Sequence, residues 1–179
     1  MKPELDVVFR GRAGELEQPD VLELGTLRWG TEPTSVGASW VPRGTLVRSD
    51  VTDGVDVDVA ADAHDLEPFA DESFDVYIAR SVYEHLSRPW LAAHAAARVM
   101  RSGAWLYVST HQTFPLHGYP HDYWRFSAQA LELIFVDAGL VEVTAGYTGP
   151  CKIVPNQPVD PWNTVAEAWL NVHVIAKKP

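Results

Sequence analysis

Residues 62–110, DAHDLEPFADESFDVYIARSVYEHLSRPWLAAHAAARVMRSGAWLYVST, contain the pattern of a strand, a helix and a second strand. The apolar run Phe74–Ala79 predicts a buried strand. A helix is predicted over Ser87–Gly103, with Ser87 as its N-cap and the glycine as its stop. Ala104–Thr110 predicts the next strand. Two strands joined by a helix favour a parallel arrangement.

The same alternation extends toward both ends of the chain. A second helix is predicted from the N-cap Ser127 to Gly139. Arg28–Pro42 should contain a crossover helix, although its sequence forms helices poorly. These patterns predict one α/β domain over residues 1–179 with a mostly parallel sheet. The remaining predicted strands are Asp20–Gly25, Thr45–Val51, Val55–Ala60, Val141–Ala145 and Asn171–Ala176.

The composition excludes several classes of protein. The 179 residues carry a formal net charge of -10 and contain no basic run, which argues against nucleic acid as a partner. The single cysteine, Cys151, excludes a disulfide framework and a cysteine zinc site. No signal peptide or membrane-spanning run is present, so we expect a cytoplasmic protein without a membrane partner.

Polar side chains follow the ends of successive predicted strands. Because the carboxyl ends of parallel strands share one sheet edge, these side chains should converge there. A single Asp at such a position usually caps a turn, but three acids at three strand ends favour a pocket. Carboxylates can accept hydrogen bonds from a ribose diol or an exocyclic amine, so the pattern predicts a nucleoside pocket. The residues are Glu23, Gly25, Asp50, Asp62, Arg80, Ser81, His85 and His111.

The first strand enters a turn that has too few glycines for a phosphate site. In VLELGTLRWG, residues 21–30, Gly25 is in place, but Leu27 and Arg28 stand where further glycines would be expected. A dehydrogenase site on a nicotinamide cofactor would need the missing glycines. A ligand without a pyrophosphate needs only one close backbone approach, at Gly25.

Residues 21–140 resemble the class I S-adenosylmethionine-dependent methyltransferases of the type 11-like group. The shared features are VLELG, an Asp before a short acidic stretch with a proline, then SFD, EHL and RVMRSGAWLYV. The last of these has Ser102 for the usual Pro and Ala104 for the second Gly. The resemblance implies a Rossmann-like, mostly parallel twisted sheet with helices on both faces and an antiparallel final strand.

The resemblance also implies S-adenosyl-L-methionine as the cofactor and assigns residues to it. Glu23, Gly25 and Thr26 would line its methionine part. Asp50, with Val51 beside it, would bind the ribose. Asp62 and the Ala63 backbone would lie at the adenine. Arg80, Ser81 and His85 would lie near the methionine part or the acceptor.

The segment THQTFPLHGYPHDYWRFS, residues 110–127, is rich in histidines and aromatic side chains. HGYPHDYWRFS resembles a run in a small-molecule and sugar-modifying subset of these methyltransferases. It predicts an acceptor site for a hydroxyl or amine of a small molecule, such as a sugar or a natural-product intermediate. A neutral imidazole suits a general base, and we predict His117 or His121 for that role. The predicted substrate-binding residues are His111, Tyr119, Tyr123, Trp124 and Arg125.

Structural roles compete with several of these predictions. Trp124 and Phe126 are expected mainly to pack the segment onto the sheet, and Arg125 could pair with Asp122 at the Ser127 helix. A metal site from His111, His117, His121 and Asp122 is a further alternative. Its spacing does not set metal geometry and Gly118 and Pro120 break a helix, so the sequence predicts no metal.

Two other functions share this sequence pattern. One is a scaffold with the methyltransferase fold that has lost its cofactor, and the other is a cofactor-binding relative with non-methylating chemistry. The chain is short for this family and has little sequence left for a lid. The acceptor is therefore expected to be open to solvent or covered by the partner subunit of a homodimer. The Pro-rich stretch 148–162 is the other candidate for a lid.

Overall fold

The computed structural model describes residues 4–118, 120–154 and 167–179. The predicted substrate residue Tyr119 and most of the candidate lid lie outside these residues. The elements, in chain order, are α1 (Leu5–Gly14), β1 (Asp20–Leu24), α2 (Gly37–Trp40), β2 (Thr45–Asp50), β3 (Val59–Ala60), β4 (Phe74–Arg80), the 3₁₀ helix η1 (Tyr83–His85), α3 (Pro89–Val99), β5 (Met100–His111), α4 (Ala128–Asp137), β6 (Val141–Cys151) and β7 (Ala168–Lys177).

Seven strands form one sheet in the order β3-β2-β1-β4-β5-β7-β6. The pairs from β3 through β5 are all parallel. The final strand, β7, runs antiparallel to both of its neighbours, β5 and β6. The predicted fold class is therefore confirmed, including the antiparallel final strand. The chain reverses its direction of strand addition between β3 and β4, so the carboxyl ends of β1 and β4 lie side by side at this switch.

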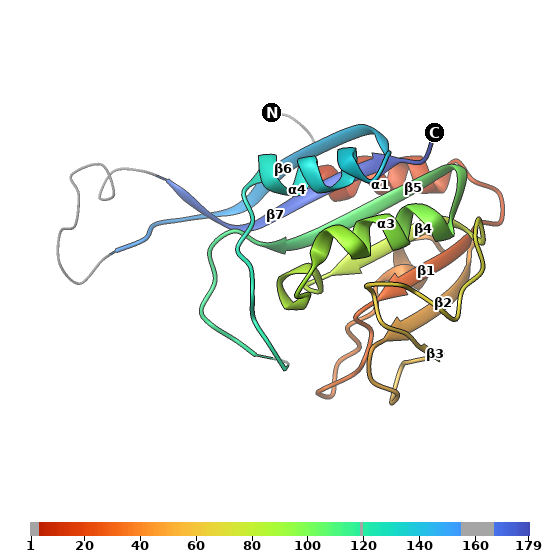
Figure 1. Ribbon diagram of the computed structural model, residues 1–179, viewed down its shortest axis with the longest axis horizontal. Coiled ribbons are helices and arrows are strands. Elements are labelled where there is room, and N and C mark those ends of the chain that lie inside the picture. Colours follow the sequence, from red (N-terminus) through yellow and green to blue (C-terminus); the bar gives the residue numbers. More distant parts are fainter. Residues whose placement is uncertain (1–3, 119, 155–166) are drawn as a thin grey trace.

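Helices cover both faces of the sheet, with α3 and α4 on one side and α1 on the other (Figure 1). Alternate residues of each central strand supply the two cores, as the pleat requires. In β4, Tyr77 and Ala79 join the core beneath α3 and α4, whereas Val76 and Ile78 join the core beneath α1. Both faces of the central strands are thus buried, as is usual for parallel sheets.

Three predicted boundaries of helices and strands are wrong. The helix predicted to reach Gly103 ends at Val99, because Met100 already pairs with Phe74 of β4 and is fully buried. The predicted N-cap Ser87 is exposed, and Arg88 occupies the cap position without a side-chain hydrogen bond. The third strand is only Val59–Ala60, because residues before it form a turn.

The edges of the domain also differ from the prediction. The expected crossover helix within residues 28–42 is the four-residue α2. Helix α1 was not predicted; it places Phe9 and Ala13 in the core of the second face. The late strands are longer than expected, and β6 and β7 form an antiparallel ribbon that extends past the other strands (Figure 1). Within the described residues, no helix is long and apolar enough to cross a membrane.

Candidate active site

A cavity of about 1020 Å³ lies at the carboxyl ends of the parallel strands. This volume is at the upper end of the range of about 300–1,000 Å³ for small-molecule sites. The structure brings most of the predicted site residues into its wall. They are Glu23, Gly25, Asp50, Val51, Asp62, Ala63, Arg80, Ser81, His85, His111, His117, His121 and Tyr123.

Gly25 makes the turn after β1 possible. Its φ of +75° belongs to the left-handed region, and a Cβ there would come within 2.5 Å of Val82 Cγ2. Its N–H donates to the Ser49 carbonyl at the end of β2. Only glycine fits a backbone position that has both this conformation and this close neighbour.

The rest of the GTLRWG turn packs on the connection between β2 and β3. Leu27 is buried and lines the cavity. The Arg28 side chain turns to Asp56, with Nε 2.6 Å and Nη2 2.5 Å from its Oδ2. Thr26 is buried and its hydroxyl donates to the Asp56 carbonyl at 2.8 Å, so its side chain supports the turn and is not part of the cavity wall.

Glu23 orders the segment that follows the turn. Its buried carboxylate accepts hydrogen bonds from Ser35 Oγ at 2.5 Å, Val36 N at 2.8 Å and Gly37 N at 2.8 Å. These bonds satisfy backbone donors at the start of α2. Glu23 therefore lines the cavity and also holds residues 35–37 in place.

Two acids from the neighbouring strand ends face the cavity. Asp50 accepts from Leu27 N at 3.3 Å and Thr52 N at 3.1 Å. Asp62 accepts from the backbone N–H of His64 at 2.9 Å, and the His64 ring lies 2.6 Å from the same oxygen. Partial burial raises the pKa of Asp62, but its contacts with His64 outweigh this effect and leave the pKa below its usual value. Both carboxylates keep lone pairs for a ligand.

Glu84 lies at the centre of the histidine cluster, on the short helix η1. Its side chain is fully buried, and Oε2 accepts from Thr110 Oγ1 at 2.6 Å. His111 Nε2 lies 3.1 Å from Oε1, which is an ion-pair distance. Burial raises the pKa of Glu84, but its contacts with His111 and Thr110 outweigh this effect, so the pKa stays below its usual value. Glu84 is thus a buried carboxylate beside the cavity, and the sequence analysis had assigned it no role.

The segment 112–126 folds over the same edge of the sheet. His111 stacks on Phe114, with ring centroids 4.1 Å apart, and His117 meets both rings edge-on. His85 Nδ1 lies 2.6 Å from the His121 carbonyl, which joins the segment to η1. His121 itself packs against Tyr123. The histidines predicted for the acceptor site, His111, His117 and His121, therefore all line the cavity.

Trp124 and Arg125 hold this segment in place and lie outside the cavity wall. Trp124 donates from its ring N–H to the Leu86 carbonyl at 2.8 Å. Arg125 binds both carboxylate oxygens of Asp122, at 2.5 and 2.7 Å, and also donates to the carbonyls of Phe114 and Pro115. The Arg125 guanidinium holds the pKa of Asp122 well below its usual range.

Several residues of the cavity wall were not singled out from the sequence. His64 immediately follows the Asp62–Ala63 pair, and its place beside a predicted site residue was the signal that could have identified it. Leu27 and Trp29 belong to the turn after β1, in which Leu27 stands where a glycine would be expected. The main additions are Leu27, Trp29, Thr34, His64, Leu86 and Phe114.

Part of the sequence is similar to a known protein family. Residues 44–108 match the model of a family described as methyltransferase domain. No curated protein matches the chain. The matched segment includes Asp50, Asp62, Arg80, Ser81 and His85, and it covers about a third of the sequence.

Solved structures share the fold over almost the whole chain. One is an S-adenosylmethionine-dependent methyltransferase from Archaeoglobus fulgidus, with 16% identity, a TM-score of 0.67, and coverage of 97% of this chain and 93% of that one. Another is 1,6-didemethyltoxoflavin-N1-methyltransferase from Burkholderia thailandensis, solved with bound 1,6-didemethyltoxoflavin and S-adenosylhomocysteine, with 13% identity, a TM-score of 0.68, and coverage of 97% of this chain and 76% of that one.

A third is phosphoethanolamine N-methyltransferase 2 from Haemonchus contortus, solved with S-adenosyl-L-methionine. It has 12% identity and a TM-score of 0.66, and the match covers 98% of this chain and 52% of that one. At these identities the likeness concerns the fold, and the family match supplies the sequence evidence. The two findings together show that the chain has the fold of S-adenosylmethionine-dependent methyltransferases and that residues 44–108 match the sequence model of a methyltransferase domain.

Proposed function

We propose that the protein transfers a methyl group from S-adenosyl-L-methionine to a small-molecule acceptor. The observation that carries this proposal is the convergence of Gly25, Asp50 and Asp62 on one cavity at the switch point of a methyltransferase fold. The Burkholderia and Haemonchus structures, which share the fold, are complexes with S-adenosylhomocysteine and S-adenosyl-L-methionine.

The cofactor would occupy the part of the cavity next to β1, β2 and β3. Asp50 has two backbone donors and keeps lone pairs for the two hydroxyls of a ribose. Asp62 and the Ala63 backbone would meet the adenine, with Val51 beside the ribose. Gly25, Arg80 and Ser81 would line the methionine part, while Glu23 and Thr26 support it by ordering the loops.

The acceptor would occupy the part of the cavity lined by histidines and aromatic rings. Methyl transfer is an in-line displacement: the S–CH₃ bond breaks, its electrons stay on sulfur, and the acceptor oxygen or nitrogen forms the new bond. The acceptor proton passes to a base, for which His117 and His121 are the candidates in the cavity wall. Orientation and water exclusion supply much of the rate, and Tyr123 and Phe114 serve both.

The class of acceptor follows from the resemblance of residues 117–127 to the small-molecule and sugar-modifying methyltransferases. The acceptor is expected to be a sugar or natural-product intermediate with a free hydroxyl or amine. Arg125 and Trp124 would act on it by positioning the segment 112–126, since Arg125 is held by carbonyls of that segment and Trp124 by the Leu86 carbonyl, just after η1. The homodimer and the cytoplasmic location stay predictions from the sequence.

Calorimetric titration with S-adenosylmethionine and S-adenosylhomocysteine tests the proposal. We expect micromolar binding of both compounds, weakened at least about tenfold, or ~1.4 kcal/mol, by Asp50→Asn. The matched control is Asp53→Asn on the same loop, because Asp53 is exposed and outside the cavity wall. Absence of binding would contradict the proposal and favour the scaffold. Binding without methyl transfer to any acceptor in a screen of hydroxyl and amine compounds would favour the non-methylating relative.

A further inference from the structure

One oxygen of the buried Glu84 carboxylate has no hydrogen-bond donor among the described residues. Oε2 is bound by Thr110, but Oε1 is buried and accepts no hydrogen bond. His111 Nε2 is near it, at 3.1 Å, without the alignment of a hydrogen bond. A buried carboxylate oxygen without an aligned hydrogen bond is unfavourable even with His111 at an ion-pair distance, so this atom favours a further partner such as a cation.

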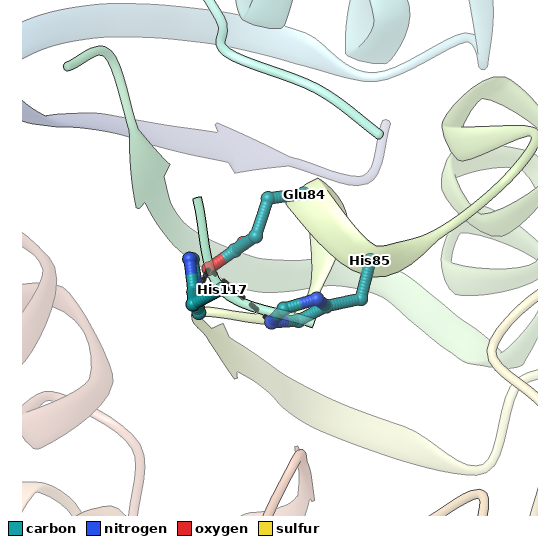
Figure 2. Close-up of side chains that lie close together, drawn as sticks. All are labelled: Glu84, His85 and His117. Carbon is teal, nitrogen blue, oxygen red and sulfur yellow. Dashed lines mark ion pairs between the residues drawn. The ribbon is translucent and has the colours of Figure 1, made fainter. Parts of the chain in front are cut away.

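Two more imidazoles direct their Nε2 atoms at the same oxygen. His85 Nε2 and His117 Nε2 each lie 3.9 Å from Glu84 Oε1. This distance is too long for a hydrogen bond, which spans about 2.7–3.2 Å. Figure 2 shows the three side chains pointing toward one another, with Glu84 and His85 from η1 and His117 from the segment that crosses it.

The hydrogen bonds on the far side of each ring prepare the Nε2 atoms as ligands. His85 Nδ1 lies 2.6 Å from the His121 carbonyl, and His117 Nδ1 lies 3.2 Å from the Pro115 carbonyl. A carbonyl only accepts, so each Nδ1 carries the proton in the neutral ring and each Nε2 keeps a lone pair. Metal-binding histidines are usually held in this way, by donating the other N–H to a carbonyl or carboxylate.

We propose that Glu84, His85 and His117 bind one divalent transition-metal ion of the zinc class. Their ligand atoms all lie within 4.8 Å of one another. Two atoms that share a zinc ion at about 2.0–2.2 Å lie roughly 3.3–4.2 Å apart for angles from tetrahedral to linear, which includes the observed 3.9 Å. The cation would neutralise the buried carboxylate and give Oε1 a directly bound partner.

The atom types of the three ligands indicate which metal ions the site would bind. Two imidazoles and one carboxylate suit zinc and its neighbours better than magnesium or calcium, which prefer oxygen ligands. Thr110 orients the carboxylate, and Asp122, itself held by Arg125, accepts from the His117 backbone N–H at 2.8 Å. This set differs from the one considered from the sequence, because Glu84 and His85 replace His111, His121 and Asp122.

A three-residue site leaves a coordination position for a ligand. His85 and His117 both line the cavity, so this position would open toward the proposed acceptor. The ion would bind the acceptor oxygen or nitrogen and orient it; this role rests on the proposed function. His117 would then be a ligand, which leaves His121 as the imidazole available to the acceptor.

Titration of the metal-free protein with Co²⁺, followed by visible absorption and by displacement with Zn²⁺, tests the site. We expect one equivalent to bind. His85→Ala and His117→Ala should each weaken binding at least about tenfold, as should Glu84→Gln, which keeps the shape of the side chain. The matched control is His94→Ala, an exposed histidine of α3 outside the cavity wall, which should bind as the unchanged protein does.

The titration contains no S-adenosyl compound, so its result is independent of the proposed function. Binding of Co²⁺ that is equally strong in the His85 and His117 variants would place the ion elsewhere and overturn the inference. Absence of binding up to millimolar Co²⁺ would also overturn it. If S-adenosylhomocysteine still binds in that case, the proposed function stands and only the metal site falls.

Discussion

Gly25 sets the tightest steric limit in the cavity wall. We expect Gly25→Ala to lower the free energy of unfolding by about 1–3 kcal/mol, because the new Cβ would be strained at φ +75° and would overlap Val82 Cγ2. S-adenosylhomocysteine binding should weaken as well, since Val82 lines the same cavity. Urea denaturation and calorimetry measure the two effects.

Gly11 provides the matched control for this substitution. It lies on an exposed part of α1, and a Cβ there would meet no atom within 4 Å. Gly11→Ala should therefore stabilise the protein by about 0.5–1 kcal/mol and leave binding unchanged. If the two variants lost similar stability, the close contact at Gly25 would not be the cause.

Asp50 and Glu84 show what single residues reveal before a structure is known. Asp50 ends a clear strand, and the rule that parallel strands share a carboxyl edge was enough to place it in the cavity. Glu84 has no such rule, because its burial depends on Thr110, which is 26 residues away along the chain. The three imidazoles around Glu84 come from η1, from β5 and from a segment without regular structure. Their approach to Glu84 Oε1 depends on the tertiary structure and cannot be predicted from their spacing in the sequence.

At the scale of elements, two serines test where helices begin. Both Ser87 and Ser127 were predicted to be N-caps, but only Ser127 accepts a helix N–H, from Ala130 at 3.2 Å. Ser127→Ala should lower the free energy of unfolding by about 1 kcal/mol, whereas Ser87→Ala should change it by less than about 0.5 kcal/mol. Chemical denaturation measures both. An equal loss in the two variants would mean that Ser87 caps α3 after all.

The central strands β1 and β4 were more predictable than most of the elements around them. The mainly apolar sequences of β1 and β4 reflect burial on both faces, and they placed these strands almost to the residue. Helix α1 fully buries only Phe9 and Ala13, and its two glycines and three charged residues leave it a weak helical pattern in the sequence. At Met100 the prediction extended a helix too far. The residue continues a sequence that favours a helix, but it pairs with Phe74 of β4 and is the first residue of β5.

At the scale of the whole molecule, the cavity depends on distant parts of one sheet. One wall of the cavity comes from residues 23–64 and the other from residues 80–123. Both walls follow the carboxyl ends of the parallel strands β1, β2, β4 and β5. The switch in strand order between β3 and β4 brings these walls together. The predicted single domain therefore has a consequence for binding: a ligand that bridges the walls should stabilise the entire chain.

Thermal unfolding with S-adenosylhomocysteine measures that coupling. At 100 times its dissociation constant, the compound should add about 2.7 kcal/mol to the free energy of unfolding. For a chain of this size that raises the midpoint by roughly 5–10 °C in one cooperative transition. Asp50→Asn should lose most of the rise at the same concentration, while Asp53→Asn should keep it. Two separate transitions, with only one shifted by the compound, would show that the walls unfold independently and that residues 1–179 do not form a single cooperative domain.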